Sequence, residues 1–302
     1  MEKVNMEIHY DERENTSLSP FGAVKKAICL VSGGMDSAVC LFHAVKNLGA
    51  KNVKALSIHY GQKGSIELEH AKRECATLGV ERYEMDLSDI FKFNKDYSSY
   101  LKGSSKEIES KEYADIIKEK LENGEAPISP EYIPARNPLL LNVAASIGLQ
   151  LFNNEKFVIL QGIHSDDVMR DSVGNSAPVY PDCSPEFANA YNKMIQLATA
   201  GLVYIYTPLS GKTKAEVAKF GIENGMTKKD FKNTWSCYNG ATHYDAKEGE
   251  NDQKIDGKFL CPTCNDKLRA LIKGAGYTVE DVMDQFDVPR EFAEKKVKEY
   301  SN

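Results

Sequence analysis

The sequence predicts an α/β fold in which a parallel sheet carries helices on both faces. Short apolar runs typical of buried strands recur along the chain, and most are followed by a segment whose apolar residues repeat at helical spacing. A strand, a helix and a second strand in this order are joined by a right-handed crossover, which makes the strands parallel. The pattern resumes in the second half without an internal repeat.

The expected strands are apolar stretches of seven to nine residues, too short for buried helices. In chain order they cover 25–32, 53–61, 81–87, 156–163 and 202–209. The expected helices run from Asp36 to a stop at Gly49, from Leu68 to a stop at Gly79, and over 138–151, 186–201 and 213–226. Glycine supplies the left-handed conformation with which many helices end.

Three parts are expected along the chain. Residues 1–24 form a polar lead, and 25–228 form the α/β domain. A charge-rich insertion at 98–131 carries one weak apolar stripe, which fits either a surface helix or a substrate lid. Residues 229–302 form a C-terminal segment that ends in two short helices on either side of Pro289.

Composition excludes several classes of function. The 302 residues carry 38 Lys and Arg against 44 Asp and Glu, a net charge of −6, whereas proteins that bind long nucleic acids usually present a basic surplus. No apolar run approaches the roughly 20 residues of a membrane helix. A cytoplasmic protein is expected, and in a reducing compartment its seven cysteines should be buried, catalytic or metal-bound rather than paired.

The clearest candidate site is Ser-Gly-Gly-Met-Asp-Ser at 32–37, where the first strand turns into the first helix. Gly33 and Gly34 let backbone N–H groups converge on an anion, and the helix directs its positive end to the same place. No Lys follows the glycines and they are adjacent, so neither of the two commoner phosphate-loop patterns fits. A plain glycine turn with a helix cap is the alternative.

This loop resembles the SGGxDS loop of N-type ATP pyrophosphatases, which cut ATP between the α and β phosphates. The resemblance implies a Rossmann-like fold of the adenine nucleotide alpha hydrolase type, a loop that holds pyrophosphate, and a role for Asp36 in placing Mg²⁺. Asp36, Ser37 and Lys214 are the implied catalytic residues. The implied ATP-binding residues are Val31, Ser32, Gly33, Gly34, Met35, Asp36, Ser37, Tyr60, Gly61 and Gln62.

Further motifs resemble those of one branch, the 7-cyano-7-deazaguanine synthases. They are YGQ at 60–62, PxRN at 134–137, GIxxxD at 162–167, YPDC at 180–183, TPL at 207–209, KxE at 214–216 and TxSCYNG at 234–240. Their order along most of the chain makes the resemblance specific. The implied substrate-binding residues are Arg136, Asn137, Asp167, Tyr180 and Asp182. Each of these residues also has an alternative role. Arg136 could form only a structural salt bridge, and Tyr180 could serve only in packing. Asp167 and Asp182 could be structural or linked to a metal.

The resemblance implies a reaction in which 7-carboxy-7-deazaguanine is adenylated by ATP, captured by ammonia as an amide, and dehydrated with a second ATP to 7-cyano-7-deazaguanine. A carboxylate is a poor electrophile, so activation as an acyl adenylate is chemically coherent. Mg²⁺, the loop N–H groups and Lys212 or Lys214 would offset the phosphate charge. The resemblance also implies a homodimer.

A cysteine cluster predicts a structural Zn²⁺ site. Cys261 and Cys264 form a C-x-x-C pair, 24 positions after Cys237, a spacing that suits one tetrahedral zinc ion. The family resembled has four cysteines here, as C, a short gap and C-x-x-C-x-x-C, but counting back three from Cys261 reaches Lys258. The predicted ligands are therefore Cys237, Cys261, Cys264 and His243. Cys183 or water is an alternative fourth ligand, and a redox pair or plain loop cysteines are alternatives to zinc.

Two departures from the family pattern surround the acceptor side. In the family, a basic residue and then His usually follow YGQ, but Gly64 stands in place of that His. The stretch from Asp167 to the YPDC segment, 13 residues at 168–180, is also longer than the family pattern. They favour one rival, an amide ligase that joins a deazaguanine carboxylate to a different amine on a small molecule or protein terminus. A tRNA-modifying enzyme is disfavoured by the net charge, and a nucleotide-binding protein without catalysis is disfavoured by the intact loop.

Overall fold

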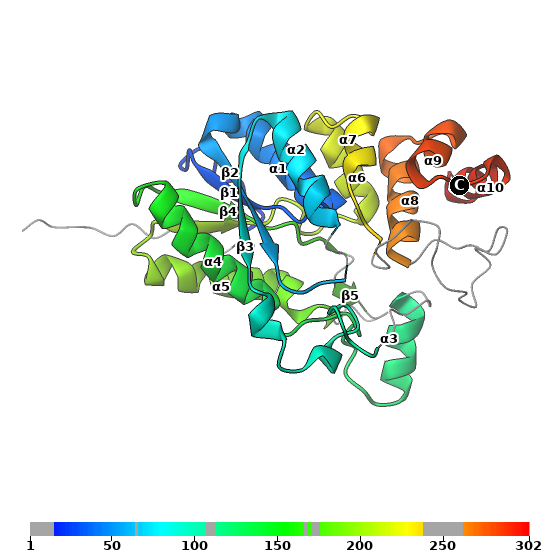
Figure 1. The fold of residues 1–302 in the computed structure, drawn as a ribbon, viewed down its shortest axis with the longest axis horizontal. Helices are drawn as coiled ribbons and strands as arrows, with labels where there is room; N and C mark the ends of the chain where they lie inside the picture. Colours follow the sequence, from blue (N-terminus) through cyan, green and yellow to red (C-terminus); the bar gives the residue numbers. More distant parts are fainter. Residues whose placement is uncertain are drawn as a thin grey trace, which may run out of the picture.

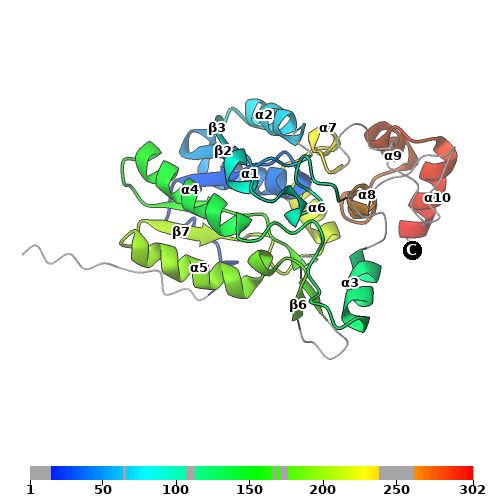
Figure 2. The ribbon, with the colours of Figure 1, turned by 60° about the horizontal axis from the view of Figure 1, so that its bottom comes forward.

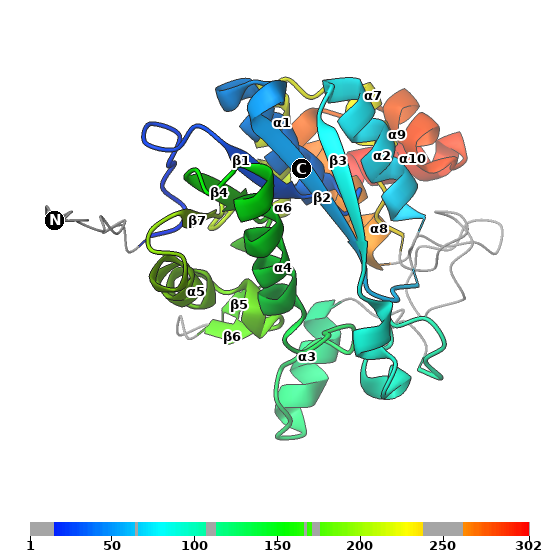
Figure 3. The same cartoon turned by 60° about the vertical axis from the view of Figure 1, so that its left-hand side comes forward.

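A parallel sheet forms the centre of the molecule, as predicted. The structure is a computed structural model and describes residues 15–63, 66–106, 113–165, 168–170, 176–237 and 262–301. Five parallel strands lie in the order β3-β2-β1-β4-β7; Figure 1 labels the first four, and Figures 2 and 3 label β7. They are β1 Ala27–Leu30, β2 Val53–His59, β3 Glu81–Asp86, β4 Phe157–Leu160 and β7 Val203–Tyr206. Each of the strands expected from the sequence is therefore confirmed.

Helices cover both faces of the sheet (Figures 2 and 3). On one face lie α1 Met35–Leu48, α2 Glu67–Leu78 and α6 Lys214–Glu223, and on the other lie α4 Arg136–Leu151 and α5 Pro185–Ala198. Because successive strand residues point to opposite faces, Cys29 of β1 joins the core under α1 while Ile28 joins the core under α4. The two predicted glycine stops are confirmed: Gly49 and Gly79 follow α1 and α2 with φ of +78° and +66°.

The C-terminal part is helical and shares the main core. It contains α7 Lys228–Asn233, α8 Pro262–Ala275, α9 Val279–Phe286 and α10 Arg290–Tyr300. One cluster of buried apolar side chains includes both Ala38 of α1 and Leu271 of α8. Helices α6 and α8 approach so closely that a Cβ on Gly274 would lie 1.9 Å from the carbonyl oxygen of Ala215. The two short helices on either side of Pro289 are confirmed, whereas α8 was not expected.

Smaller elements lie within the two insertions. Helix α3, Tyr113–Glu122, falls in the charge-rich insertion, and its Ile116 and Ile117 are buried while Leu121 is exposed. The long stretch at 168–180 contains an antiparallel ribbon of two strands, β5 Val168–Arg170 and β6 Ser176–Pro178. Outside these insertions, short 3-10 helices cover Ala50–Asn52, Ser88–Phe91, Lys95–Tyr97 and Pro181–Cys183. Among the described helices, none has the length and apolarity that crossing a membrane requires.

Candidate active site

The loop at 32–37 lies at the carboxyl edge of the sheet, where it follows β1 and runs into the first turn of α1. In the strand order β3-β2-β1-β4-β7, the chain proceeds outward from β1 to β2 and β3 and later resumes at β4 on the other side of β1. Open α/β sheets bind ligands where the order reverses in this way, in the crevice outside the strand ends. The loop therefore occupies the topological switch point.

Serine hydroxyls hold the loop in shape. The backbone N–H of Ser32 donates to Ser37 Oγ over 3.2 Å, and the N–H of Gly34 donates to Ser32 Oγ over 3.2 Å. Ser37 Oγ donates to the carbonyl oxygen of Gly34 over 2.9 Å. These contacts fix the N-terminal end of α1, whose backbone N–H groups and dipole favour an anion.

Gly33 occupies a position that no other residue can take without distortion. Its φ is +94°, and a Cβ there would lie 2.0 Å from the carbonyl oxygen of Glu67 in the first turn of α2. The carbonyl of Gly33 accepts a hydrogen bond from the backbone N–H of Trp235 over 2.8 Å. The loop is therefore held between α2 and the segment that follows α7.

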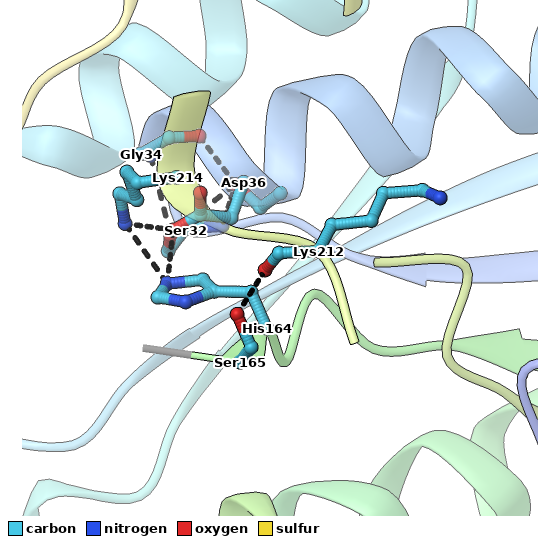
Figure 4. Close-up of polar contacts among 8 residues, drawn as sticks. Ser32, Gly34, Asp36, His164, Ser165, Lys212 and Lys214 are labelled. Atoms are coloured by element: carbon cyan, nitrogen blue, oxygen red, sulfur yellow. Dashed lines mark hydrogen bonds and ion pairs between the residues drawn. The ribbon is translucent and has the colours of Figure 1, made fainter. Parts of the chain in front are cut away.

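Asp36, Lys214 and His164 form one polar cluster beside the loop (Figure 4). Lys214 Nζ, at the start of α6, donates to Asp36 Oδ2 over 2.7 Å and lies 3.0 Å from His164 Nε2. His164 Nε2 is itself 3.6 Å from Asp36 Oδ2. Burial acts to raise the pKa of Asp36, but the charges and hydrogen bonds of Lys214 and His164 outweigh it and hold that pKa well below its usual range. Asp36 is therefore ionised at neutral pH.

The second carboxylate oxygen of Asp36 suits a divalent cation. Oδ1 is buried and accepts no hydrogen bond from the residues that the structure describes. Mg²⁺ usually binds to one or two carboxylates together with substrate phosphates, so a single carboxylate at a phosphate loop fits this ion. Asp36 would hold this ion together with nucleotide phosphates and water.

His164 was not among the predicted site residues, although it lies within the GIxxxD motif at 162–167. It follows β4, the strand next to β1, and its neighbour Gly162 packs on the backbone of Asp36, where a Cβ would lie 3.2 Å from the carbonyl. Ser165 then donates through N and Oγ to the carbonyl of Lys212, over 2.9 and 2.8 Å. These contacts tie the end of β4 to both α1 and the start of α6.

A second group joins predicted ATP-binding residues to a predicted substrate-binding residue. Gln62 Oε1 accepts from the N–H of Tyr60 over 2.9 Å, and Gln62 Nε2 donates to Glu67 Oε1 over 3.1 Å. Arg136 Nη1 donates to the hydroxyl of Tyr60 over 3.2 Å, and its guanidinium lies 5.3 Å from the centre of that ring. The two predicted subsites thus adjoin. Glu67 was not among the predicted site residues.

Two of the other predicted substrate-binding residues, Asn137 and Asp182, meet at the start of α4. Asp182 Oδ2 accepts from the N–H of Asn137 over 3.1 Å, and the side-chain amide of Asn137 donates to the carbonyl of Asp182 over 3.2 Å. The hydroxyl of Tyr180 accepts from Ser129 Oγ over 3.1 Å. The structure thus links Asn137 with Asp182, whereas Asp167 lies outside the described residues.

Glu67 makes stability depend on pH. Burial raises its pKa from 4.5 to about 7, against the opposing effects of the Gln62 hydrogen bond and the Arg136 charge. The unfolded chain therefore releases this proton first, and the free energy of unfolding falls as pH rises from about 4.5 to 7. In Glu67→Gln, we expect this pH-dependent fall in the free energy of unfolding, about 1 to 3 kcal/mol, to disappear.

The measurement is urea unfolding at pH 5 and pH 8 for the parent chain and for Glu67→Gln. Exposed Glu69 on the same helix provides a matched control, Glu69→Gln, which should keep the parent's pH dependence. An unchanged difference between the two pH values in Glu67→Gln would contradict the assignment.

The described cysteines are buried. Cys237 and Cys264 are 1% and 0% exposed, but Cys261 and His243 lie outside the described residues. No group of three or more metal-binding side chains occurs within the part of the chain that the structure describes. Cys29, Cys40 and Cys75 lie in the core, as cysteines outside a site do.

Comparison with known proteins agrees with the motifs. A family model described as queuosine biosynthesis protein QueC matches residues 26–274. The 7-cyano-7-deazaguanine synthase of Pseudoalteromonas atlantica is 32% identical over 83% of this chain and 95% of its own. That of a Marinomonas species is 33% identical over 82% and 93%. Among solved structures, NMN synthetase from Francisella tularensis is 14% identical, with 92% of this chain and 84% of that chain covered. The TM-score of 0.38 marks a distant likeness.

The match spans more than half of the chain, and the relatives are covered almost entirely. The expectation that the chain is an enzyme of the ATP-dependent ligase type is confirmed by these relatives. The chain belongs to the queuosine biosynthesis protein QueC family.

Proposed function

We propose that the chain converts 7-carboxy-7-deazaguanine, ATP and ammonia to 7-cyano-7-deazaguanine. The substrate carboxylate attacks the α-phosphorus of ATP, the bond to the bridging oxygen breaks, and pyrophosphate leaves. Ammonia adds to the acyl carbon and AMP leaves, which gives the amide and a proton. The amide oxygen then attacks a second ATP in the same way, and loss of AMP with the nitrogen-bound protons leaves the nitrile.

The observation that carries this proposal is the cluster of Asp36, Lys214 and His164 beside the loop. Lys214 is held by Asp36 and His164 at the start of α6, so its positive charge is fixed next to the loop before a ligand arrives. The departing pyrophosphate gains negative charge as the α–β bond breaks, and a fixed cation with loop N–H groups stabilises that charge. Mg²⁺ bound through Asp36 would supply further positive charge.

Arg136 is the proposed partner of the substrate carboxylate. Its guanidinium is part-buried, stacks on Tyr60 and lies at the N-terminal end of α4. A planar guanidinium binds a carboxylate in a defined orientation, and the helix end favours an anion at the same place. A carboxylate held there lies beside the residues assigned to ATP, as attack on the α-phosphorus requires.

Zn²⁺ and a homodimer remain parts of the proposal. Cys237 and Cys264 are buried thiols of the kind that bind structural zinc, and Cys261 and His243 are the other proposed ligands. The metal would stabilise the C-terminal segment next to the active site. The proposed reaction uses small molecules, which fits a cytoplasmic enzyme without long nucleic acid as a partner.

The test is incubation with ATP, Mg²⁺, 7-carboxy-7-deazaguanine and ammonium, followed by mass spectrometry. We expect the nitrile, with two AMP formed per product, and zinc in a metal count on the same preparation. Absence of AMP under all conditions would overturn the proposal. AMP formation that requires tRNA would replace it with a tRNA-modifying function.

A second candidate function has one structural observation in its favour. The ribbon of β5 and β6 occupies the stretch that is longer than the family pattern, directly before Tyr180. This change lies on the proposed acceptor side, while the loop at 32–37 is unaltered. An amide ligase that uses another amine would keep ATP binding and change the acceptor. An amide that persists with ammonium, or product formed only with another amine, would favour this function.

A further inference from the structure

One lysine that has no role in the proposed reaction is fully buried, and its contacts lead to the loop at 32–37. Lys267 of α8 is 0% exposed, in a structure whose lysines are mostly at the surface. Removing an amine from water costs several kcal/mol unless hydrogen bonds replace those to water. Such a residue therefore needs a specific reason for its position.

The amine of Lys267 binds the end of α7. Nζ donates to the carbonyl oxygen of Thr234 over 2.6 Å and to that of Phe231 over 3.3 Å. Carbonyl groups at the end of a helix have no partner within the helix, and side-chain donors commonly satisfy them. Burial lowers the pKa of Lys267 to about 7, against the opposing charges of Cys264 and Glu74, but the amine can donate in either protonation state.

The segment that Lys267 holds continues directly into the loop contact. Trp235 follows Thr234, and its backbone N–H donates to the carbonyl of Gly33 over 2.8 Å. In a trans peptide, the carbonyl and the next N–H point in opposite directions. Fixing the carbonyl of Gly33 toward Trp235 therefore directs the N–H of Gly34 to the other side, where it donates to Ser32 Oγ over 3.2 Å.

Other contacts hold the same segment from the side of α2. The ring of His70 binds the carbonyl of Asn233, and the side-chain amide of Asn233 donates to the carbonyl of His70 over 3.2 Å. The indole N–H of Trp235 donates to the carbonyl of Cys237 over 2.9 Å. His70 thus fixes this segment laterally, while Lys267 fixes it from α8.

We propose that Lys267 is a positioning residue of the loop at 32–37: through the carbonyls of Phe231 and Thr234 it sets Trp235, and through Trp235 it fixes the Gly33–Gly34 peptide of the loop that would hold pyrophosphate. This inference rests on the proposed function, because it assigns pyrophosphate to the loop. It adds a role for the C-terminal helix α8, which supports the loop from outside the sheet.

The test compares two buried lysines of the C-terminal helices. Lys267→Met keeps the volume and removes the donors. Lys296→Met is the matched control, because Lys296 of α10 is 4% exposed and, among the residues that the structure describes, donates within its own helix, to Glu299 and Tyr300, over 2.9 and 3.3 Å. Pyrophosphate binding is measured by calorimetry at a temperature where both variants and the parent are folded.

We expect Lys267→Met to weaken pyrophosphate binding about tenfold and to raise the KM for ATP more than it lowers kcat. Lys296→Met should bind within about twofold of the parent, whatever its loss of stability. If Lys267→Met does not fold, Lys267→Gln keeps a donor nitrogen on a shorter side chain, and an intermediate loss of affinity is expected.

Unchanged pyrophosphate affinity in folded Lys267→Met or Lys267→Gln would overturn the inference while leaving the proposed function intact. Equal loss in Lys267→Met and Lys296→Met would also overturn it, because a general loss of stability would then account for both. A parent chain that binds neither ATP nor pyrophosphate would overturn the proposed function and this inference together.

Discussion

Asp36→Asn should abolish AMP formation, with a loss of roughly 100- to 1,000-fold or more. The substitution keeps the shape of the side chain but removes the negative charge that binds Lys214 over 2.7 Å and would bind Mg²⁺. Lys214 then loses the carboxylate of Asp36, and the magnesium–nucleotide complex loses its proposed protein ligand. The measurement is AMP released from ATP in the presence of 7-carboxy-7-deazaguanine.

A matched control comes from another lysine–aspartate pair. Asp284 binds Lys232 over 2.5 Å at the surface, where ion pairs contribute about 1 kcal/mol or less. Asp284→Asn should therefore retain near-normal AMP formation and melting temperature. Near-normal turnover in Asp36→Asn would count against the assignment of the loop.

The strands and the loop were predictable because their signals are local. The apolar run at 25–32 and the two adjacent glycines after it are contiguous in the sequence, and so are the helix stops at Gly49 and Gly79. The rule for crossovers predicts that the strands are parallel, and the five strands of the sheet are parallel. These features depend on backbone preference and apolar periodicity, which neighbouring residues determine.

The arrangement of the site was not predictable to the same degree. His164 and Lys214 reach Asp36 from segments 128 and 178 residues away, and no spacing in the sequence records which side chain will face which. His164 stood at a variable position of its motif. Only its place after a strand beside the switch point could have drawn attention to it.

Helix α8 was missed although the sequence contains the apolar spacing that predicts it. Cys264, Leu268 and Leu271 are buried at helical spacing, which is the pattern of a core-facing helix. The C-x-x-C pair predicts a zinc site, and the helical spacing of the same stretch was not recognised beside it. In the structure, the second cysteine lies in the first turn of the helix, so metal-ligand spacing and helical periodicity coexist in the same residues.

Gly33→Ala should have the second large effect, on both folding and ligand binding. A methyl group at this position would lie 2.0 Å from the carbonyl oxygen of Glu67 and 2.9 Å from the backbone N of Ala71. Neither atom belongs to a flexible side chain, so α2 and the loop must separate. We expect a loss of about 3 to 5 kcal/mol in the free energy of unfolding and loss of ATP binding.

Two other glycines separate the causes of this loss. Gly225 has φ of +96°, and nothing lies within 4 Å of the place that a methyl group would take, so Gly225→Ala reports the backbone strain alone, about 1 kcal/mol. Gly34 lies in the loop at φ of −79°, and the nearest atom to a Cβ is Ser32 Oγ at 3.3 Å, so Gly34→Ala should fold with little loss. Urea unfolding of the three variants measures the difference. If Gly33→Ala lost no more stability than Gly225→Ala, the loop would not be clamped against α2, and the orientation proposed for its amide groups would have no structural support.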